Sequence, residues 1–464
     1  MLVIGFYANR KQKTTEDYYV AGRRLGSFSI MVLWIASWIG GASIIGSAGT
    51  AYDIGITGIW YVATMGVGCI LFAVFFSPLV KKIGDRLKNI TYPEFIEARY
   101  DGRSRTIATV STILAYIAYT AGQLAAAGGI LHTLLGWDLL TSFIVAAVVV
   151  ILYTTTGGYL AVTYTDWIQF SLLILGVTVL GVPLAWSAVG GISGLQTTLP
   201  AGHWDIGAWG WSTIIGLCVT ITFSFFTTMD SYTRMFAAKD AKAAKNGTLL
   251  AVLALGIIAV SATFLGLAAR TLFPGLEGGG SIAMATLIQS LFPVGLKGLV
   301  LVGILAAIMS TADICILTAS ANLTEDIYHR YINQEASESF LHKFGMASSL
   351  FIGVLSAIMA WKLMDIINIL YIAFTINSAG LFFPTIAALY WKKANASAAF
   401  WSMTASLATV LFWYIGGTYA WAPMFSLDPV WPGLIVSAGI FFPMCYLKDA
   451  SQSEVEKMNN FFSA

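Results

Sequence analysis

Apolar runs long enough to cross a lipid bilayer recur from one end of this 464-residue chain to the other. A hydrocarbon core about 30 Å thick requires roughly 20 apolar residues per helix. Because 58% of the residues are hydrophobic and only 10% are charged, the chain lacks the polar surface that a water-soluble globule needs. The sequence therefore predicts an all-α polytopic membrane protein with about twelve spanning segments, at residues 26–52, 57–80, 106–135, 139–156, 160–189, 211–233, 247–272, 296–327, 340–361, 365–391, 396–416 and 430–447.

Basic residues alternate between the two sides of the predicted bundle. Lys and Arg near short loops are retained on the cytoplasmic side of a membrane. All of the 25 basic residues except Arg270, Lys297 and Lys362 fall in alternate connections, which indicates an even number of spans. We therefore expect both termini in the cytoplasm and the chain in the plasma (inner) membrane. The apolar opening at residues 1–7 is too short to span and resembles the end of a truncated helix.

Composition and motifs argue against several other classes of protein. The formal charge of +2 is too small to indicate a nucleic-acid partner, and the four cysteines and four histidines lack the spacing of a metal or disulfide site. No nucleophile elbow, phosphate loop or histidine cluster indicates an enzyme. Two longer outer connections, 190–210 and 273–295, are either lids or surface decoration, and we favour decoration.

Three aspartates lie in or near apolar segments, where an ionisable side chain costs about 2.5–3.5 kcal/mol. Asp230 has Arg234 four residues later, which predicts an ordinary ion pair on one helix face. Asp313 lies deep in its segment with no basic residue at that depth. A transported cation or a proton is the natural counter-charge there. Asp166 either belongs to such a membrane site or reaches cytoplasmic water.

Two adjacent hydroxyls precede Asp313 in its segment. Ser310 and Thr311 either coordinate a hard cation such as sodium, which prefers oxygen ligands, or bond back to carbonyls one turn earlier. The first segment offers further ligands, since residues 34–49 (WIASWIGGASIIGSAG) contain four glycines, each of which weakens a helix by about 1 kcal/mol relative to alanine. A helix break there would free backbone carbonyls. Close helix packing through small residues also explains some of these glycines.

Three motifs give the chain a family resemblance. Residues 17–23 (DYYVAGR), 157–169 (GGYLAVTYTDWIQ) and 306–311 (AAIMST) followed by 324–328 (TEDIY) are similar to sequences of the sodium:solute symporter family. The resemblance covers nearly the whole chain. It implies a five-plus-five inverted repeat of the leucine-transporter type, with broken first and sixth core helices and one further helix before the core.

The resemblance also implies a division of the chain into regions. Each region corresponds to a structural unit of the family, namely the end of a truncated N-terminal helix with a cytoplasmic loop at 1–25, the first repeat at 26–189, the second repeat at 211–391, and two peripheral helices with a cytoplasmic tail at 392–464.

A sodium site between the first and eighth segments is implied by the same resemblance. Its ligands, carried over position by position, are the carbonyls of Ala36, Ile39 and Ala307 and the hydroxyls of Ser310 and Thr311. This sequence has an acceptable residue at each position.

Some family members have a second sodium site, whose aspartate matches Asp166. The hydroxyl expected one turn after Ser310 is replaced by Asp313, so a proton or a direct solute contact becomes an alternative to a second sodium ion. Residues 36–41 and 309–313 are locally similar to the choline transporter branch, although Thr228 stands where an aromatic cage for a quaternary ammonium needs a tryptophan. The implied solute-binding residues are Trp38, Ser43, Tyr119, Gln123, Phe225 and Thr228.

Together these features predict a sodium-coupled secondary active symporter that imports a small organic solute, such as an amino acid or a quaternary amine, by alternating access. The coupling ion would be Na⁺, and membrane lipid would surround the chain. A sensory membrane module and a sodium-independent facilitator are the alternatives. The short tail after Lys448 argues against an attached signalling domain.

Overall fold

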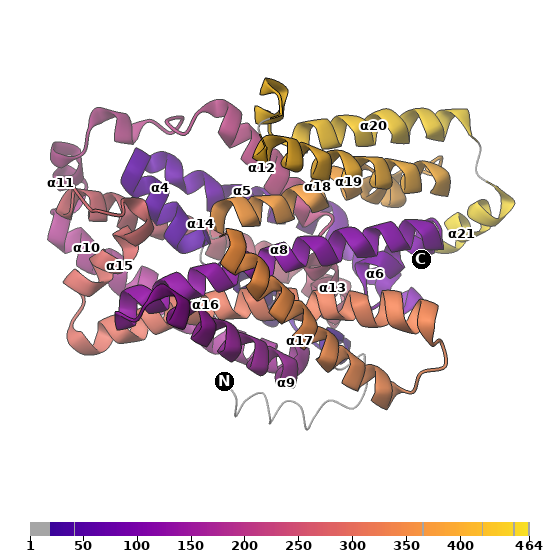
Figure 1. Cartoon of the computed structure of the whole chain (residues 1–464), viewed down its shortest axis with the longest axis horizontal. Helices are drawn as coiled ribbons and strands as arrows, with labels where there is room; N and C mark the ends of the chain where they lie inside the picture. Colours follow the sequence, from indigo (N-terminus) through magenta and orange to yellow (C-terminus); the bar gives the residue numbers. More distant parts are fainter. Residues whose placement is uncertain (1–18, 41, 364–365, 420, 449–450, 463–464) are drawn as a thin grey trace.

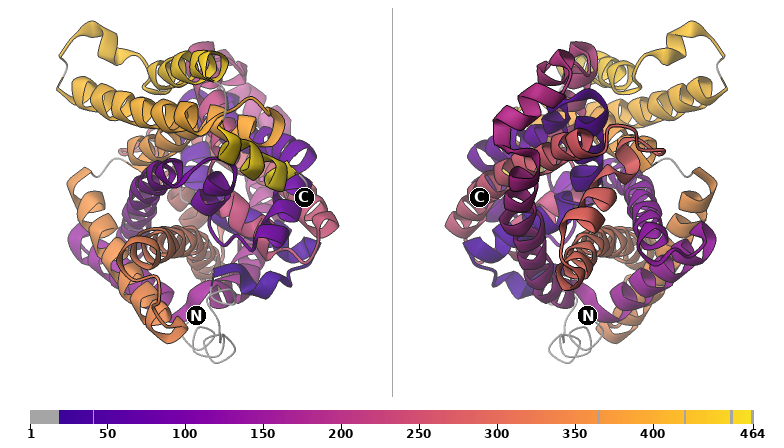
Figure 2. Two further views of the ribbon diagram at one scale, coloured as in Figure 1. Left: turned by 90° about the vertical axis from the view of Figure 1, so that its right-hand side faces the viewer. Right: turned by 90° about the vertical axis from the view of Figure 1, so that its left-hand side faces the viewer.

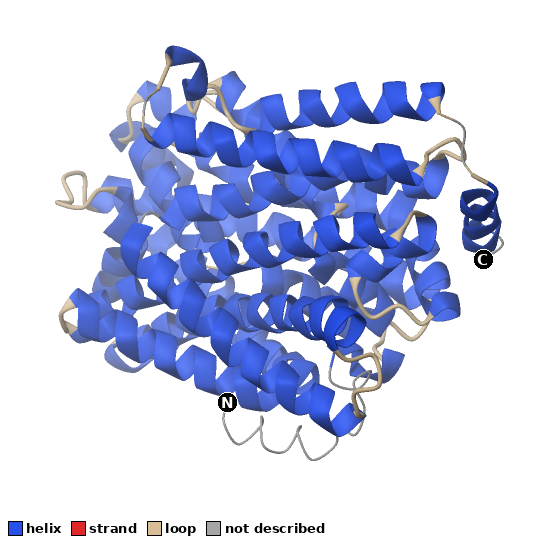
Figure 3. Cartoon of the chain, turned by 45° about the vertical axis from the view of Figure 1, so that its right-hand side comes forward, coloured by secondary structure: helices blue, strands red, loops and turns tan. Residues whose placement is uncertain are grey.

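The computed structural model describes residues 19–40, 42–363, 366–419, 421–448 and 451–462. Helices form the regular secondary structure of this part of the chain, apart from one isolated parallel β-bridge between Leu25 and Ala238 (Figure 3). The expected end of a truncated helix at residues 1–7 lies outside the described residues.

The α-helices follow one another through short connections or short π-helical and 3-10 segments (Figure 1). Their bounds are Ser27–Trp38 (α3), Ser47–Ile54 (α4), Trp60–Leu71 (α5), Ser77–Leu87 (α6), Tyr92–Arg99 (α7), Gly102–Leu135 (α8), Leu139–Leu173 (α9), Val182–Val189 (α10), Gly191–Thr198 (α11), Trp211–Phe225 (α12), Met229–Ala237 (α13), Ala241–Leu272 (α14), Gly280–Leu291 (α15), Val294–Ala321 (α16), Glu338–Leu363 (α17), Ile366–Tyr390 (α18), Ala396–Thr418 (α19), Val430–Leu447 (α20) and Gln452–Phe462 (α21).

Within the described residues, 9 helices are long and apolar enough to cross a membrane, or up to 11 if each of two bent helix pairs is one span. These correspond to all the expected segments except 139–156. That segment forms the first part of α9, Leu139–Leu173, which extends into the segment expected to be separate. The difference has a simple reason, since glycine lowers helix propensity but does not by itself end a helix.

Breaks interrupt the first and sixth core helices, as expected. α3 ends at Trp38, Ile39 leaves the helical conformation (φ −99°, ψ 82°), and the chain resumes in a π-helical turn, Ala42–Gly46, before α4. The two halves are bent by 67°. A smaller bend of 40° separates α12 from α13, with residues 226–228 between them. Both breaks therefore fall where the family resemblance placed them.

α16 packs against α3, α8, α9 and α17, and its side chains from Ala306 to Ile308 and from Ser310 to Ala321 are buried. By contrast, α14 exposes large apolar side chains such as Leu253 and Val260, which suits contact with lipid. α19 and α20 pack together on one flank of the bundle, as the end-on views in Figure 2 show in yellow and orange. Candidate polar residues on α16 therefore lie inside the protein.

The connection at 273–295 is more than surface decoration. It contains α15, whose apolar residues Ala283, Met284, Leu287 and Ile288 are buried and which packs on α4. Backbone meets backbone there, because a Cβ atom added at Gly280 would lie 2.2 Å from the carbonyl oxygen of Gly49. Asp53 caps the start of α15, since its Oδ1 accepts a hydrogen bond of 3.0 Å from the Gly280 amide. The start of α15 therefore covers α4, the second half of the broken first helix, which favours the lid interpretation.

Candidate functional site

The break in the first core helix frees three successive carbonyls at the end of α3. A helix ends with carbonyl groups that have no partner in the helix, and buried carbonyls need one. Side-chain hydroxyls from outside α3 donate hydrogen bonds to all three carbonyls. The Ser37 carbonyl accepts from the Tyr119 hydroxyl at 3.2 Å, and the Trp38 carbonyl accepts from the Ser43 hydroxyl at 2.6 Å. The third, that of Ala36, faces α16.

Two hydroxyls of α16 converge on the Ala36 carbonyl. Ser310 Oγ donates to it at 3.1 Å and Thr311 Oγ1 at 2.8 Å. The same hydroxyls also lie 2.8 and 3.1 Å from the Ala307 carbonyl, so back-bonding within α16 is present as well. Ser310 and Thr311 are completely buried. The structure therefore brings together four of the five oxygens expected at the sodium site.

The fifth expected ligand, the carbonyl of Ile39, belongs to the residue that directly follows α3. The hydroxyls of Ser310 and Thr311 donate to Ala36 rather than to Ile39. All of these groups are neutral oxygens, which suits a hard monovalent cation without placing a permanent charge in the membrane. When the hydroxyl hydrogens turn away, all four converging oxygens can present lone pairs to one ion.

Two carboxylates at membrane depth have oxygens without a hydrogen-bond partner among the described residues. Asp313, on α16, accepts a short hydrogen bond from the Thr154 hydroxyl at one oxygen, and its other oxygen has no partner in the described part of the chain. Both oxygens of Asp166, on α9, also lack partners among the described residues. Both side chains are completely buried, and α9 packs against α16. In this structure the Asp166 carboxylate is separated from solvent by burial, and its role stays a prediction.

Asp230 forms the expected ion pair with Arg234, at 2.6 Å between Oδ2 and Nη2, and both side chains are buried. The Tyr116 hydroxyl donates a short hydrogen bond to the other carboxylate oxygen. Arg234 also donates from Nε to the Leu33 carbonyl at 3.2 Å, and its guanidinium lies 4.3 Å from the centre of the Trp34 ring. This network joins α13 to α3 below the break.

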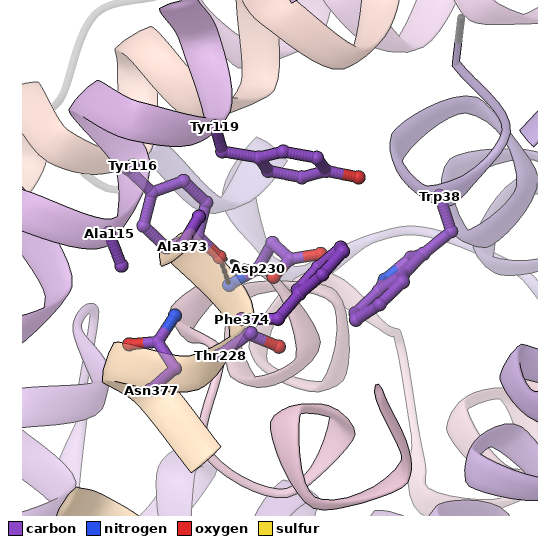
Figure 4. Close-up of a pocket in the computed structure, with 9 residues that line it drawn as sticks. All are labelled: Trp38, Ala115, Tyr116, Tyr119, Thr228, Asp230, Ala373, Phe374 and Asn377. Carbon is purple, nitrogen blue, oxygen red and sulfur yellow. Dashed lines mark hydrogen bonds between the residues drawn. The ribbon is translucent and has the colours of Figure 1, made fainter. Parts of the chain in front are cut away.

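A small cavity lies beside the break (Figure 4). Its volume is about 10 Å³, close to what one water molecule needs, so a solute requires the helices to move apart. Three of the six expected solute-binding residues line it: Trp38, Tyr119 and Thr228. The other lining residues were not predicted; they are Ala115, Tyr116, Asp230, Ala373, Phe374 and Asn377. Among these, Asn377 is a polar residue in an apolar segment, a signal like that of Asp313.

The other three expected residues, Ser43, Gln123 and Phe225, support the cavity wall instead of lining it. Phe225 stacks on Trp38 with ring centres 3.9 Å apart, and Ser43 bonds to the Trp38 carbonyl. Gln123 packs so closely on Gly40 that a Cβ atom there would lie 2.4 Å from Gln123 Oε1. These three contacts fix the shape of the broken helix. They also hold the Trp38 ring in the cavity wall.

Relatives of known activity resemble the chain over nearly its full length. It is 26% identical to the osmoregulated proline transporter OpuE of Bacillus subtilis, with 98% of this chain and 94% of the relative covered. It is also 26% identical to the sodium/pantothenate symporter of Escherichia coli (94% and 91% covered) and 27% identical to the sodium/glucose cotransporter of Vibrio parahaemolyticus (88% and 82% covered). These relatives are transporters, in agreement with the expectation that the chain is not an enzyme.

Solved structures confirm the fold. A Na⁺-coupled sialic acid symporter, in a substrate-bound outward-open state, superposes with a TM-score of 0.80 at 24% identity and covers 97% of this chain and 96% of its own. Mhp1, a nucleobase-cation-symport-1 family transporter, gives a TM-score of 0.59 at 16% identity and covers 95% and 98%. The family model matches residues 18–405. The chain is therefore a multi-pass membrane protein that belongs to the sodium:solute symporter family.

Proposed function

We propose that the chain imports a small organic solute with sodium, and that the coupling ion binds where α3 meets α16. The observation that carries this proposal is the convergence of two buried hydroxyls, Ser310 and Thr311, on the Ala36 carbonyl that the helix break leaves free, at 3.1 and 2.8 Å. A site made from two separate helices can respond to their relative movement. Ile39 and Ala307 complete the proposed ligand set.

Alternating access follows from this placement. Sodium bound between α3 and α16 stabilises the arrangement in which the solute site is open to the outside, which raises solute affinity, and the loaded carrier then opens inward. Coupling is therefore a difference in affinity between two states. A membrane potential adds about 2.3 kcal/mol per charge per 100 mV, enough to concentrate a neutral solute.

Asp166 and Asp313 are proposed to hold a second positive charge, either a proton or a second cation. Three of their four carboxylate oxygens lack a hydrogen-bond partner in the described part of the chain. Buried carboxylates are neutralised by protonation or paired with a cation. Thr154, which donates to Asp313, is the neutral member of this proposed site.

The solute is proposed to occupy the cavity beside Trp38, Tyr119 and Thr228, with Ser43, Gln123 and Phe225 supporting it. Relatives named for proline, pantothenate and glucose differ widely in chemistry, so the family does not fix the solute. We also propose that both termini lie in the cytoplasm, that the membrane is the plasma membrane, and that 26–189 and 211–391 form the two repeats.

Purified protein tests the sodium site before any solute is known. Replacing KCl by NaCl at constant ionic strength should raise the melting temperature, because a ligand that binds only the folded state stabilises it. Once thermal shifts identify a solute, its uptake into proteoliposomes should require an inward sodium gradient. Equal uptake in sodium and in potassium would favour the facilitator instead.

A further inference from the structure

Unpartnered polar atoms in the cavity wall indicate what the missing partner must offer. Asn377, on α18, is 3% exposed and lines the cavity, yet its Oδ1 accepts no hydrogen bond from any described residue (Figure 4). Buried amide oxygens almost always have a donor. The Trp38 indole N–H, 2% exposed, is likewise without a partner in the described part of the chain. The cavity wall therefore offers a solute one unpartnered acceptor, Asn377 Oδ1, and one unpartnered donor, the Trp38 N–H.

The cavity also contains the carboxylate of Asp230. Tyr116 donates to one of its oxygens and Arg234 to the other. A carboxylate offers about four lone-pair positions, so each oxygen can accept a further bond. With Asn377 Oδ1, the carboxylate gives the polar wall of the cavity two groups that can accept a hydrogen bond from a solute. The basic partner, Arg234, is not among the residues that line the cavity.

Aromatic faces form the rest of the wall. Trp38 and Phe374 are nearly parallel, with ring centres 5.5 Å apart and planes inclined by 5°, and Tyr119 lies 5.2 Å from Phe374. The faces of such rings attract cations. An aromatic wall beside two hydrogen-bond acceptors favours a cation that also carries hydrogen atoms on nitrogen.

We propose that the solute presents a protonated primary or secondary amine to Asn377 and Asp230, with Asn377 as the residue that selects for N–H. This rests on the proposed function, because it assumes that the cavity is the solute site. A quaternary ammonium could use the rings but has no hydrogen for Asn377. A sugar hydroxyl could bond to Asn377 and to the carboxylate, but a neutral sugar gains less from the carboxylate charge and the ring faces than a cation does.

Matched pairs of probes test the proposal by thermal shift in NaCl. L-proline is compared with N,N-dimethylproline, and glycine with trimethylglycine, while glucose and pantothenate represent solutes without an amine. We expect sodium-dependent binding of at least one amine, and binding about tenfold or more weaker for its N-methylated partner, the loss typical of a hydrogen bond to a charged group. Asn377→Leu should remove this difference, and Asn377→Asp should strengthen amine binding.

Ser378→Ala is the matched control, because Ser378 is buried next to Asn377 on α18 and bonds to the Thr375 carbonyl without lining the cavity. Tighter or equal binding of the quaternary members overturns the proposal, and so does sodium-dependent binding of glucose or pantothenate alone. If sodium by itself stabilises the protein but neither amine binds, the amine assignment fails and the sodium site stands. If sodium has no effect, the proposed function itself fails.

Discussion

Two oxygen clusters lie close together along α16, the second of them shared with Asp166 of α9, and they differ in how they bind positive charge. The Ser310 and Thr311 hydroxyls are neutral and already have hydrogen-bond acceptors in the Ala36 and Ala307 carbonyls. The carboxylates of Asp313 and Asp166 are charged when ionised and mostly without partners in the described residues. The first cluster can therefore release an ion at little cost, whereas the second needs a proton or cation at every stage. The Ser310 and Thr311 hydroxyls are therefore the better suited of the two clusters to reversible ion binding.

Replacing both the Ser310 and the Thr311 hydroxyls should have the largest effect, a loss of sodium affinity. Ser310→Ala with Thr311→Ala removes two of the proposed sodium ligands, and we expect sodium to bind about 100-fold more weakly, or about 2.7 kcal/mol. Titrating NaCl against KCl while following the melting temperature measures it. Ser320→Ala is the control, since this buried hydroxyl of α16 bonds to the Gly345 carbonyl and to no other group in the described part of the chain. A double variant that keeps its sodium response would remove the distinction between the clusters.

Asp313→Asn should have the next largest effect, on pH dependence. At low sodium, raising the pH removes the proton that is proposed to neutralise the Asp166–Asp313 pair, so the wild-type protein should lose about 1–3 kcal/mol of stability as the pH rises. The variant has one carboxylate fewer, and its stability should change less with pH. Melting temperatures across the pH series provide the measurement.

The result also separates the two candidates for the second charge. If added sodium restores wild-type stability at high pH in a Ser310→Ala, Thr311→Ala background, the pair binds a cation; if it does not, the pair holds a proton. Identical pH profiles for wild type and Asp313→Asn would show that the pair holds neither.

Thr154→Val should have the smallest effect. The Thr154 hydroxyl donates to Asp313 and also lies 2.8 Å from the Val150 carbonyl. Its removal should cost about 1 kcal/mol at high pH, the usual net value of a hydrogen bond, and less at low pH, where Asp313 is neutral. Thr112→Val is a matched control, because among the described residues that buried hydroxyl bonds to the Ala108 carbonyl alone. Equal losses in the two variants, measured by chemical denaturation, would mean that Thr154 does not serve the carboxylate.

Much of this architecture could be predicted because its signals are local. The glycines after Trp38 indicated the helix break, and the four-residue spacing of Asp230 and Arg234 indicated their ion pair, which the structure confirms. Polar residues in apolar segments indicated Ser310, Thr311 and Asp313. Each of these inferences depends on neighbours within a turn or two of helix.

The cavity wall could not be predicted in the same way. Phe374 and Asn377 reach Trp38 from a helix more than 300 residues away in sequence, and nothing near them indicates that contact. The position of α15 was missed for a similar reason, since its buried face meets α4, far back in the chain. Proximity across the bundle depends on packing, and sequence spacing does not report it.

The contact between Gly49 and Gly280 has a consequence for how a cell conserves its ion gradients. Two main chains touch there without side chains, so even a methyl group at Gly280 would act as a wedge. A carrier that cannot close at one end can let ions move down their gradient without transporting solute. Bacteria and mitochondria alike spend metabolic energy to maintain such gradients, and a leak of this kind would drain them continuously. Glycine at these two positions therefore lets the two backbones meet closely enough to oppose such a leak.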